Sequence, residues 1–310
     1  MRTLYKRLHT LTAAILAFGA LLVGNAGLAA AQADAKREKI VISGASGQLG
    51  NLVVKELLAR GVPASDLILV SRTPEKLDEY AKLGATTRFG DFTKPESLPA
   101  AYAGGTKLLL ISIGLDAGPR PEAHKRAVDA AVAVGIKHIV YTSFVAISRG
   151  DRTGLASDHF ATEETIKNSG VAWTMLRNSI YANGLVQQAA KMLADGKAVV
   201  SDSDSRIGYI TREDCAVAAA AVLANPGHEN KAYDITGPEL IGPREIAAAA
   251  SAVTGKKIQL VAPDPNAPAR RGFGGPSFEV VSDDFAKITG RPATSIRELF
   301  EAHRNELLGQ

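Results

Sequence analysis

The stretch KIVISGASGQLGNLVVKELL, residues 39–58, limits the possible fold more than any other part of the chain. Its apolar residues 40–42 are typical of a buried strand, and the residues after the last glycine have the apolar spacing of a helix. Between them stand Gly44, Gly47 and Gly50. In this pattern the first glycine permits a tight turn, the second lets the backbone approach a diphosphate, and the third lets the helix pack on the sheet. The stretch therefore predicts a nucleotide-binding loop.

The chain repeats this alternation up to about residue 177. Strand-like runs rich in Val, Ile and Leu occupy residues 40–43, 67–70, 86–89, 107–111, 138–141 and 172–176. Helical patterns separate them at residues 48–60, 75–83, 95–102, 121–134 and 157–169. Strands and helices alternating at this interval are typical of a parallel sheet with helices on both faces. We predict the α/β class, with a doubly wound parallel sheet of the Rossmann, NAD(P)-binding type and ligands at the carboxyl ends of its strands.

The pattern after residue 177 predicts a smaller C-terminal α/β lobe. Helical patterns at residues 185–194, 212–223, 243–253, 282–289 and 295–308 alternate with strand-like runs at residues 198–200, 231–236 and 257–261. Residues 262–276 are rich in Pro, Gly and Arg, which is typical of a loop. We predict a leader at residues 1–33, an NAD(P)-binding domain at residues 34–180, and a substrate lobe at residues 181–310 that is interleaved with that domain.

Polar residues at the predicted strand ends indicate which dinucleotide the loop takes. Arg72 follows the second strand and lies 22 residues after Gly50. At this point an acid would bond the ribose 2′-hydroxyl of NAD, whereas a cation accommodates the 2′-phosphate of NADP. The forked guanidinium suits a phosphate, so NADP(H) is the predicted cofactor; a solvated loop arginine is the alternative. The N–H groups near Ser46, Gln48 and Leu49 are predicted to face the diphosphate. The other contacts predicted from position are Asp91 and Phe92 at the adenine, and Ser112, Ile113 and Gly114 under the nicotinamide ribose.

The chain lacks the usual base of short-chain dehydrogenases. That base is the tyrosine of a Tyr-x-x-x-Lys pair, and none of the seven tyrosines has a lysine four residues later. In the corresponding helix, His159, Glu163 and Lys167 are spaced four residues apart and share one face. This face predicts either a proton relay that includes His159 or a solvated helix face with ordinary ion pairs. We predict no metal site.

Five segments, taken together, resemble the NmrA-like atypical short-chain dehydrogenases, and within them the type 2 NADPH:quinone oxidoreductases. The segments are GASGQLG, VSRTPEKL, GDFTKPESLPAAYAGGTKLLLIS, HKRAVDAAVAVGIKHIVYTS and HFATEETIKNSGVAWTMLRNSIYANGL. The similarity runs from about Lys39 to Glu298. It implies a Rossmann domain with a smaller lobe, NADPH at the glycine loop, and reduction of a quinone. Direct hydride transfer to a quinone does not require the missing tyrosine.

The resemblance also implies a cleft for the nicotinamide and the substrate. The residues implied to line or border it are Thr142, Ser143, Phe144, Arg177, Asn178 and Tyr181. Catalysis would depend on orientation and on hydrogen bonds from Thr142 and Ser143 to the developing oxyanion, with His159 as an optional proton source. The alternative roles are structural: a strand-end cap for Thr142 and Ser143, a pair with a buried acid for Arg177, and apolar lining for Tyr181.

Two other functions stay open on the sequence alone. One is a non-catalytic redox sensor that binds NADP(H) and reports to a partner. The other is a reductase of a different carbonyl substrate, against which the absent Tyr-x-x-x-Lys pair weighs.

The charge balance argues against a nucleic-acid partner. The formal net charge is +4, but residues 1–33 carry three basic residues and no acid, which leaves 33 basic and 32 acidic residues in the remainder. Phosphate neutralisation requires a basic surface, which this balance does not provide. The single cysteine, Cys215, cannot form an intramolecular disulfide.

Residues 1–33 have the features of an export signal. Arg2, Lys6 and Arg7 precede the apolar residues 11–24, and residues 31–33 read Ala-Gln-Ala, with a cut expected before Asp34. The apolar segment is shorter than the roughly 20 residues of a membrane span, which favours a cleaved signal; an uncleaved anchor is the alternative. We therefore expect an exported or periplasmic protein, with the cytoplasm as the alternative because free NADPH is expected only there. Partners would be a quinone-like small molecule and a transient membrane contact through the leader, in a monomer or homodimer.

Overall fold

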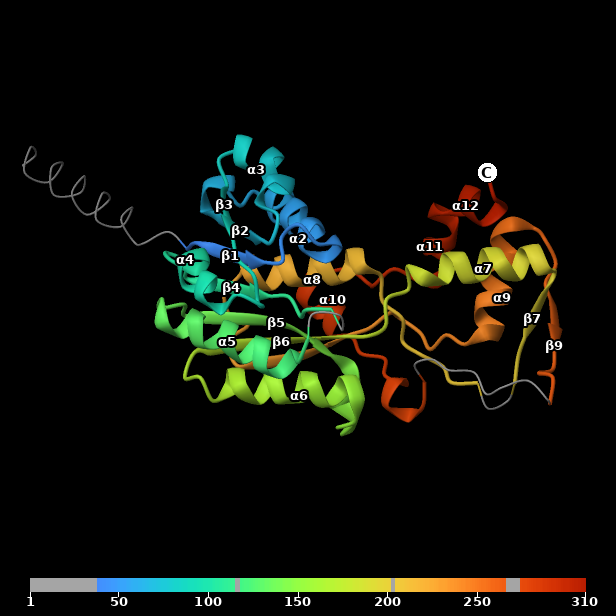
Figure 1. The fold of residues 1–310 in the computed structure, drawn as a ribbon. Helices are drawn as coiled ribbons and strands as arrows, with labels where there is room; N and C mark the ends of the chain where they lie inside the picture. The colour runs from blue at the N-terminus through green and yellow to red at the C-terminus, as the bar shows by residue number, and fades with distance from the viewer. Residues whose placement is uncertain (1–37, 115–117, 202–203, 266–273) are drawn as a thin grey trace, which may run out of the picture. The chain divides into compact units, whose positions relative to one another are not determined.

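A single parallel sheet organises most of the chain, as the computed structural model shows (Figure 1). The structure describes residues 38–114, 118–201, 204–265 and 274–310; the predicted leader lies outside them. Within the described residues the sheet has seven strands in the order β3-β2-β1-β4-β5-β6-β8. They are β1 Ile40–Ser43, β2 Leu67–Ser71, β3 Thr86–Phe89, β4 Lys107–Leu110, β5 His138–Phe144, β6 Ala172–Asn178 and β8 Lys231–Ile235. This order places the reversal between β1 and β4, where α/β sheets bind ligands.

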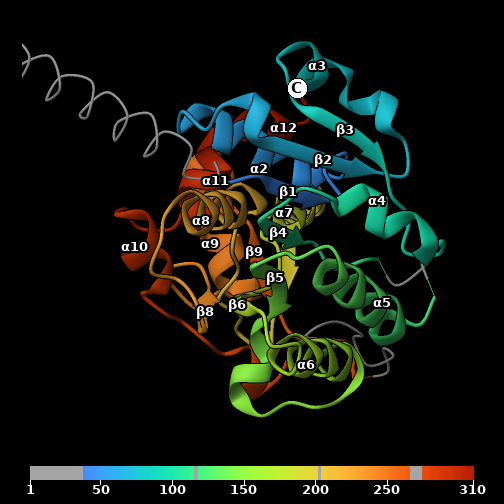
Figure 2. The same ribbon diagram turned by 90° about the vertical axis from the view of Figure 1, so that its left-hand side faces the viewer.

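Helices cover both faces of the sheet (Figure 2). Alternate residues of a strand point to opposite faces, and β1 follows this rule. Val41 joins the apolar core under α4 Leu98–Tyr102, α5 Arg120–Ala133 and α6 Gly154–Lys167. Ile42 joins the core under α2 Gln48–Ala59 and α8 Arg212–Ala224. Burial on both faces explains the continuous apolar runs, and the predicted doubly wound sheet is confirmed.

The remaining short elements lie around the rim of the sheet. They are α3 Asp78–Lys82, α10 Asp284–Thr289 and the 3-10 turns η1 Ala64–Asp66, η2 Pro74–Leu77, η3 Pro95–Ser97, η5 Val145–Arg149 and η6 Pro276–Phe278. Strand β5 extends three residues beyond its predicted end, so Thr142, Ser143 and Phe144 belong to the strand and do not follow it. Two predicted helices, at residues 75–83 and 95–102, begin with these 3-10 turns, each with Pro in its first turn.

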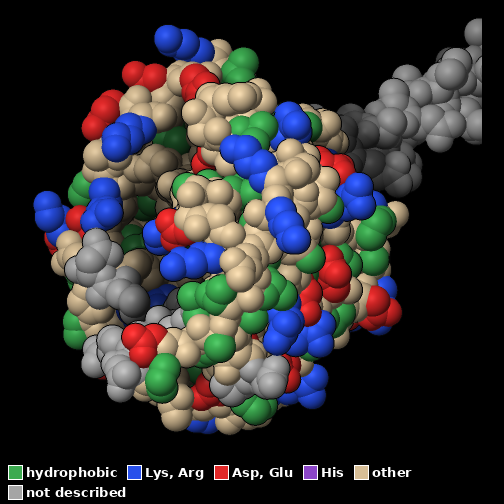
Figure 3. All heavy atoms as spheres, turned by 90° about the vertical axis from the view of Figure 1, so that its right-hand side faces the viewer, with side chains coloured by type: hydrophobic (Ala, Val, Ile, Leu, Met, Phe, Trp, Pro, Cys, Tyr) green, Lys and Arg blue, Asp and Glu red, His purple; other side chains and the backbone are tan. Residues whose placement is uncertain are grey.

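The smaller C-terminal lobe has its own apolar core. It contains α7 Gly184–Asp195, β7 Lys197–Val199, α9 Pro243–Thr254, β9 Gln259–Val261, α11 Ile296–Ala302 and α12 Arg304–Leu308. Strands β7 and β9 pair in parallel, and the core includes Leu185, Ile246 and Phe300. Basic and acidic side chains are interspersed on the face shown in Figure 3.

The prediction of one continuous helix at residues 295–308 is wrong. Ser295 and Glu298 form a capping box at the start of α11, as the sequence pattern predicts. The helix ends at Ala302, and α12 begins at Arg304, with His303 between them. There Arg304 Nε donates to the carbonyl oxygen of Val253 on α9 at 3.2 Å. This tertiary contact is not encoded in the local helical spacing.

The predicted domain division after residue 180 stays a prediction. Strand β8 and helix α8, which come from the second half of the chain, belong to the main sheet and its cover. Part of the predicted loop at residues 262–276 lies outside the described residues. Among the residues that are described, no helix is long and apolar enough to cross a membrane.

Candidate active site

The glycine loop joins β1 to α2 and lies beside the end of β4. Gly44 has φ +94°, in the left-handed region that glycine adopts readily. The N–H groups of Gly44 and Ala45 both donate to the carbonyl oxygen of Val70, at 3.0 Å each. A Cβ placed on Gly50 would lie 2.2 Å from the carbonyl oxygen of Gly44, and one placed on Gly44 would lie 3.5 Å from Ile111 Cβ. The loop is thus a tight turn pressed against its own helix.

The start of α2 leaves backbone N–H groups available to a ligand. Gly47 is the N-cap residue and no side chain caps the helix, so the first N–H groups, including those of Gln48 and Leu49, keep no side-chain partner. Beside them, Ser46 Oγ lies 2.6 Å from Ser71 Oγ. Free N–H groups at a helix N-terminus, with hydroxyls beside them, fit a phosphate. The residues present therefore fit the diphosphate of a dinucleotide.

The ends of β2 and β3 bring Arg72 close to Asp91. Arg72 is exposed, and its positive charge acts on the Asp91 carboxyl. Asp91 Oδ1 accepts from the N–H of Thr93 at 2.9 Å and from its hydroxyl at 2.8 Å. Burial raises the pKa of Asp91, but these hydrogen bonds and the charges of Arg72 and Lys94 outweigh it, so the pKa lies below its ordinary value. One Asp91 oxygen therefore stabilises the turn that follows β3. The predicted contact of Asp91 with the adenine stays a prediction.

Phe92 faces the neighbouring helix α5. Its ring makes an edge-to-face contact with His124, with the ring centroids 6.1 Å apart. Phe92 is partly buried against the apolar core under α4, α5 and α6. Its predicted contact with adenine also stays a prediction.

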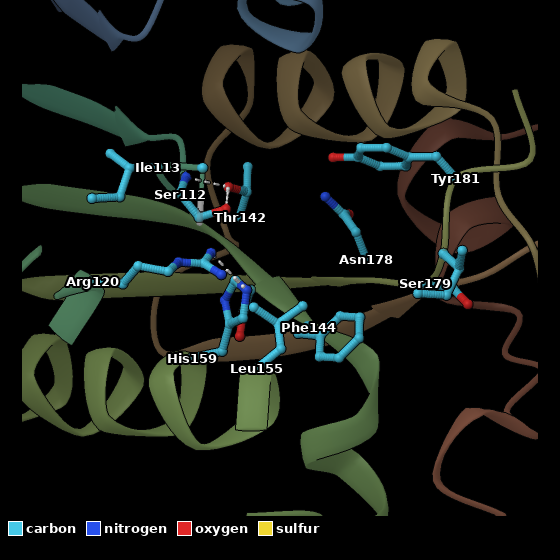
Figure 4. A pocket seen from close by; sticks show the side chains of 13 residues that line it. Ser112, Ile113, Arg120, Thr142, Phe144, Leu155, His159, Asn178, Ser179 and Tyr181 are labelled. Carbon is cyan, nitrogen blue, oxygen red and sulfur yellow. Dashed lines mark hydrogen bonds between the residues drawn. The ribbon is translucent and has the colours of Figure 1, made fainter. Parts of the chain in front are cut away.

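A pocket of about 380 Å³ opens at the carboxyl ends of β4, β5 and β6 (Figure 4). This volume is in the range of small-molecule sites. The predicted residues that line it are Ser112, Thr142, Ser143, Phe144, His159, Asn178 and Tyr181. The lining also includes Ile113 and Gly114, which were predicted with Ser112 to lie at the nicotinamide ribose. Arg120, Leu155, Ser179 and Ile180 line it too, and the sequence did not single them out. The structure thus brings together residues that are up to 69 positions apart, from Ser112 to Tyr181.

The hydroxyl groups of Thr142 and Ser143 already have protein partners. Thr142 Oγ1 accepts from the N–H of Ser112 at 2.9 Å and lies 3.4 Å from its hydroxyl, which links β5 to the segment after β4. Ser143 Oγ donates to Glu163 Oε1 at 2.6 Å. Thr142 therefore acts as a strand-end link, while both residues still line the pocket. Their predicted role as oxyanion donors is not tested by this geometry.

Arg177 does not line the pocket, unlike the other residues predicted for the substrate. Its Nε and Nη2 donate to Glu163 Oε1 and Oε2 at 2.9 and 2.8 Å, and the Glu163 side chain is fully buried. Burial raises the pKa of Glu163, but hydrogen bonds from Arg177 and Ser143 and the charges of Arg177 and Lys167 lower it below its ordinary value. Arg177 therefore forms an ion pair with a buried acid, which was the structural alternative predicted for it.

A buried chain of polar groups runs from the pocket into α6. Arg120 Nη2 donates to His159 Nε2 at 3.2 Å, and His159 Nδ1 lies 2.8 Å from the hydroxyl of Tyr141. Since arginine is only a donor, Nε2 accepts, and the imidazole proton is on Nδ1. Burial, and then the charges of Arg120 and His124, hold the pKa of His159 well below its ordinary value. His159 is therefore neutral at physiological pH, and its role as a proton source stays a prediction.

His124 extends this chain on the α5 side. Its Nε2 accepts from the N–H of Ile113 at 3.1 Å, and its Nδ1 lies 3.0 Å from Thr162 Oγ1, which donates to the carbonyl oxygen of Asp158. Burial, followed by the charge of Arg120, lowers the pKa of His124 to about 3. The neutral ring thereby fixes the backbone at Ile113, one residue after Ser112.

Three buried polar atoms in the pocket lining lack a hydrogen-bond partner within the described structure. They are Arg120 Nε, Asn178 Oδ1 and Ser179 Oγ. Buried polar atoms in native proteins are nearly always paired, so their concentration at one cavity indicates a polar ligand. The sequence contained one signal that points to Arg120: it is a cation at the start of a helix that follows a strand end.

Comparison with known proteins identifies the family. A family described as NAD(P)H-binding matches residues 44–226, which include the glycine loop and all the residues that line the pocket. The chain belongs to the NAD(P)H-binding, NmrA-like family. Quinone oxidoreductase 2 of Escherichia coli is 36% identical over 219 residues, which cover 71% of this chain and 76% of that protein. The NAD(P)H azoreductase of Xenophilus azovorans is 27% identical over 85% of this chain and 97% of its own length.

Solved structures of NAD(P)H-binding relatives agree with this assignment. The triphenylmethane reductase of Citrobacter sp., complexed with NADP(H), has a TM-score of 0.76 at 31% identity and covers 85% of this chain and 99% of its own. Escherichia coli quinone oxidoreductase 2, complexed with NADPH, has a TM-score of 0.74 at 30% identity and covers 86% and 100%. This chain is accordingly an NAD(P)H-dependent oxidoreductase with the predicted Rossmann fold.

Proposed function

We propose that this chain is an NADPH-dependent quinone reductase that works by direct hydride transfer. The observation that carries the proposal is the pocket at the ends of β4, β5 and β6, beside the glycine loop, in a chain similar to quinone oxidoreductase 2. Phe144, Leu155 and Tyr181 supply flat and apolar walls suited to a quinone ring. The unpaired polar atoms of the lining suit its oxygens.

Arg72 supports the choice of NADPH over NADH. It stands at the end of β2, exposed and beside the hydroxyl-bearing Ser71. A guanidinium at this position accommodates the 2′-phosphate that distinguishes NADPH from NADH. The uncapped N–H groups at the start of α2, from Gln48 onward, would hold the diphosphate.

The chemistry requires little from the protein beyond position and electrostatics. When bound, NADPH supplies a hydride from its nicotinamide ring. The pocket residues orient the acceptor against that ring, and the apolar walls exclude water from the reacting atoms. No Tyr-x-x-x-Lys pair is present, so the proton that completes the hydroquinone would come from water or from a nearby group, with His159 as the optional source.

The test is oxidation of NADPH across a panel of quinones, aldehydes, ketones, azo dyes and triphenylmethane dyes. Turnover with quinones, and a kcat/KM for NADPH well above that for NADH, supports the proposal. Turnover confined to another class of acceptor would contradict the quinone proposal and would identify that class as the substrate. Tight NADP(H) binding with no turnover of any acceptor would favour a redox sensor.

We further propose that residues 1–33 direct the protein out of the cytoplasm and make its contact with the membrane during export. The positive residues, the apolar segment and Ala-Gln-Ala at residues 31–33 support this. Folding with the cofactor already bound, before export, would meet the need for NADPH. N-terminal sequencing of the fractionated protein tests the idea: a chain that begins at Asp34 in the periplasm supports it, and an intact Met1 in the cytosol contradicts it.

A further inference from the structure

Arg120 is a buried cation with too few partners for its charge. The residue is only 6% exposed, and Nη2 donates a hydrogen bond to His159. Among the residues that the structure describes, Nε has no hydrogen-bond partner. A guanidinium has five N–H donors and stays charged at every physiological pH. Burying such a charge without an anion is costly, so the arrangement indicates a ligand that brings the negative charge.

No carboxylate lines the pocket among the residues that the structure describes. The buried acid nearest in the polar network, Glu163, is already bound by Arg177, Ser143 and Lys167. Asp158 is half-buried on α6 and is not part of the lining. The charge of Arg120 therefore faces the pocket without a counter-ion from this part of the chain.

The polar chain behind Arg120 holds it in place without neutralising it. His159 is locked as an acceptor toward Arg120 because its other nitrogen donates to Tyr141. The imidazole is neutral, since its pKa lies well below the ordinary value. In Figure 4 the guanidinium of Arg120 meets His159 beside the space that Phe144 and Leu155 border. A cation fixed in this way needs no reorganisation when negative charge develops next to it.

We propose that Arg120 binds the oxygen of the electron acceptor on which negative charge develops during reduction, an inference that rests on the proposed quinone-reductase function. The acceptor gains the hydride with its two electrons, the cofactor is oxidised to NADP⁺, and the charge left on the acceptor oxygen takes a proton from water. Arg120 stabilises that oxyanion before the proton arrives. The alternative anion is a phosphate of the cofactor, but the N–H groups that suit a phosphate lie at the uncapped start of α2, at Gln48 and Leu49.

The first test measures binding of a charged product analogue and needs no turnover. A nitrophenol, whose phenolate form absorbs visible light, is titrated against the NADP⁺ complex over a range of pH. Wild type is expected to hold the bound phenol ionised at least one pH unit lower than Arg120→Met does, a tenfold or larger change in the ionisation constant. Arg126→Met, the same change at an exposed position of the same helix, is expected to match wild type. Equal ionisation in Arg120→Met and wild type, or no phenolate binding by wild type, overturns the proposal.

The second test separates the acceptor from the cofactor. Arg120→Met is expected to lower kcat with a quinone by about 100-fold, the usual effect of losing one oxyanion donor, and to leave the Kd of NADPH within about threefold of wild type. Arg120→Lys is expected to recover part of the rate because it keeps the charge without the fork. A loss confined to NADPH affinity overturns the proposal in favour of the phosphate.

Folding and function are checked apart from this role. Thermal unfolding followed by circular dichroism identifies any variant that does not fold. If Arg120→Met does not fold, Arg120→Lys and Arg120→Gln take its place in both tests. If wild type reduces no quinone, the proposed function fails, while the nitrophenol titration still decides whether Arg120 binds an oxyanion.

Discussion

Replacing Gly50 with alanine should disable cofactor binding through a shift of the loop. The added Cβ would lie 2.2 Å from the carbonyl oxygen of Gly44 and 2.9 Å from Ala45 Cα, both backbone atoms that cannot rotate away. Ordinary contact between such atoms needs about 3.5 Å, so the loop must move by roughly 1 Å. The N–H groups of Gly44 and Ala45 are fixed on Val70, and this movement would strain both bonds.

The expected magnitude follows from this displacement. A misplacement of about 1 Å at a positioning element costs about 100-fold, so the Kd of NADPH should rise by about that factor. The free energy of unfolding should fall by about 1–3 kcal/mol, the usual cost of overpacking. The Kd is measured by titrating the fluorescence of bound NADPH, and stability is measured by urea unfolding.

Gly184→Ala is the matched control for this change. Gly184 is the first residue of α7, and a Cβ built there meets nothing within 4 Å. Alanine favours a helix, so this variant should bind NADPH like wild type and should be equally or more stable. A Gly50→Ala protein that binds NADPH within about threefold of wild type would refute the reasoning that close packing at Gly50 positions the loop.

Three further predictions test other parts of the site. Arg72→Ala should lower the kcat/KM ratio of NADPH to NADH by about 10- to 100-fold, since hydrogen bonds to charged groups are worth about 1.5–3 kcal/mol; an unchanged ratio would assign the 2′-phosphate to other donors. Glu163→Gln should lower the free energy of unfolding at neutral pH by about 3–5 kcal/mol, because Arg177 would lose its buried partner. Glu164→Gln, at a half-exposed side chain on the same helix, should change it little. The pKa of Glu163 in the folded protein lies below its ordinary value of 4.5, so its stabilising contribution to folding is present above that pH and is lost as the pH falls through the folded pKa. Urea unfolding at several pH values should therefore show the stability difference between wild type and Glu163→Gln shrinking in this range. A difference that stays constant would contradict this. The pKa of His124 is about 3 in the folded protein, against an ordinary value of 6.5, so between these pH values only the unfolded chain takes up the proton. The free energy of unfolding of the wild type should therefore fall by up to about 1.4 kcal/mol for each pH unit of acidification in this range. A His124→Asn protein whose stability has the same pH slope would count against this.

The main sheet was predictable because its signal is local. Apolar residues 40–42, 108–110 and 139–141 are buried on both faces, so each run is continuous and its boundaries are marked by polar residues or glycine. The glycine pattern added the strand–loop–helix order and the ligand edge. Elements whose ends depend on distant contacts were placed less well, as the break at His303 shows, because the contact of Arg304 with Val253 spans 51 positions.

The candidate site was predictable where position along the fold decides it. Ser112, Thr142 and Asn178 stand at strand ends, and parallel strands bring such ends to one edge of the sheet. Arg177 was placed in the cleft although it is the neighbour of Asn178 in β6. Adjacent strand residues point to opposite faces, and Arg177 points to the side where α6 carries the buried carboxylate of Glu163. Sequence spacing does not show that pairing.

The helix face of His159, Glu163 and Lys167 shows how one periodicity can serve two separate tasks. Spacing of four residues correctly places His159 and Glu163 on the side of α6 that faces the sheet, where both are buried. Tyr141 and Ser143, two residues apart on β5, point to that same side and meet them. The histidine then belongs to the group that holds Arg120 at the pocket, while the glutamate belongs to the group that neutralises Arg177. One arginine is therefore paired with an acid and structural, and the other is held by a neutral imidazole, which leaves its charge for the ligand.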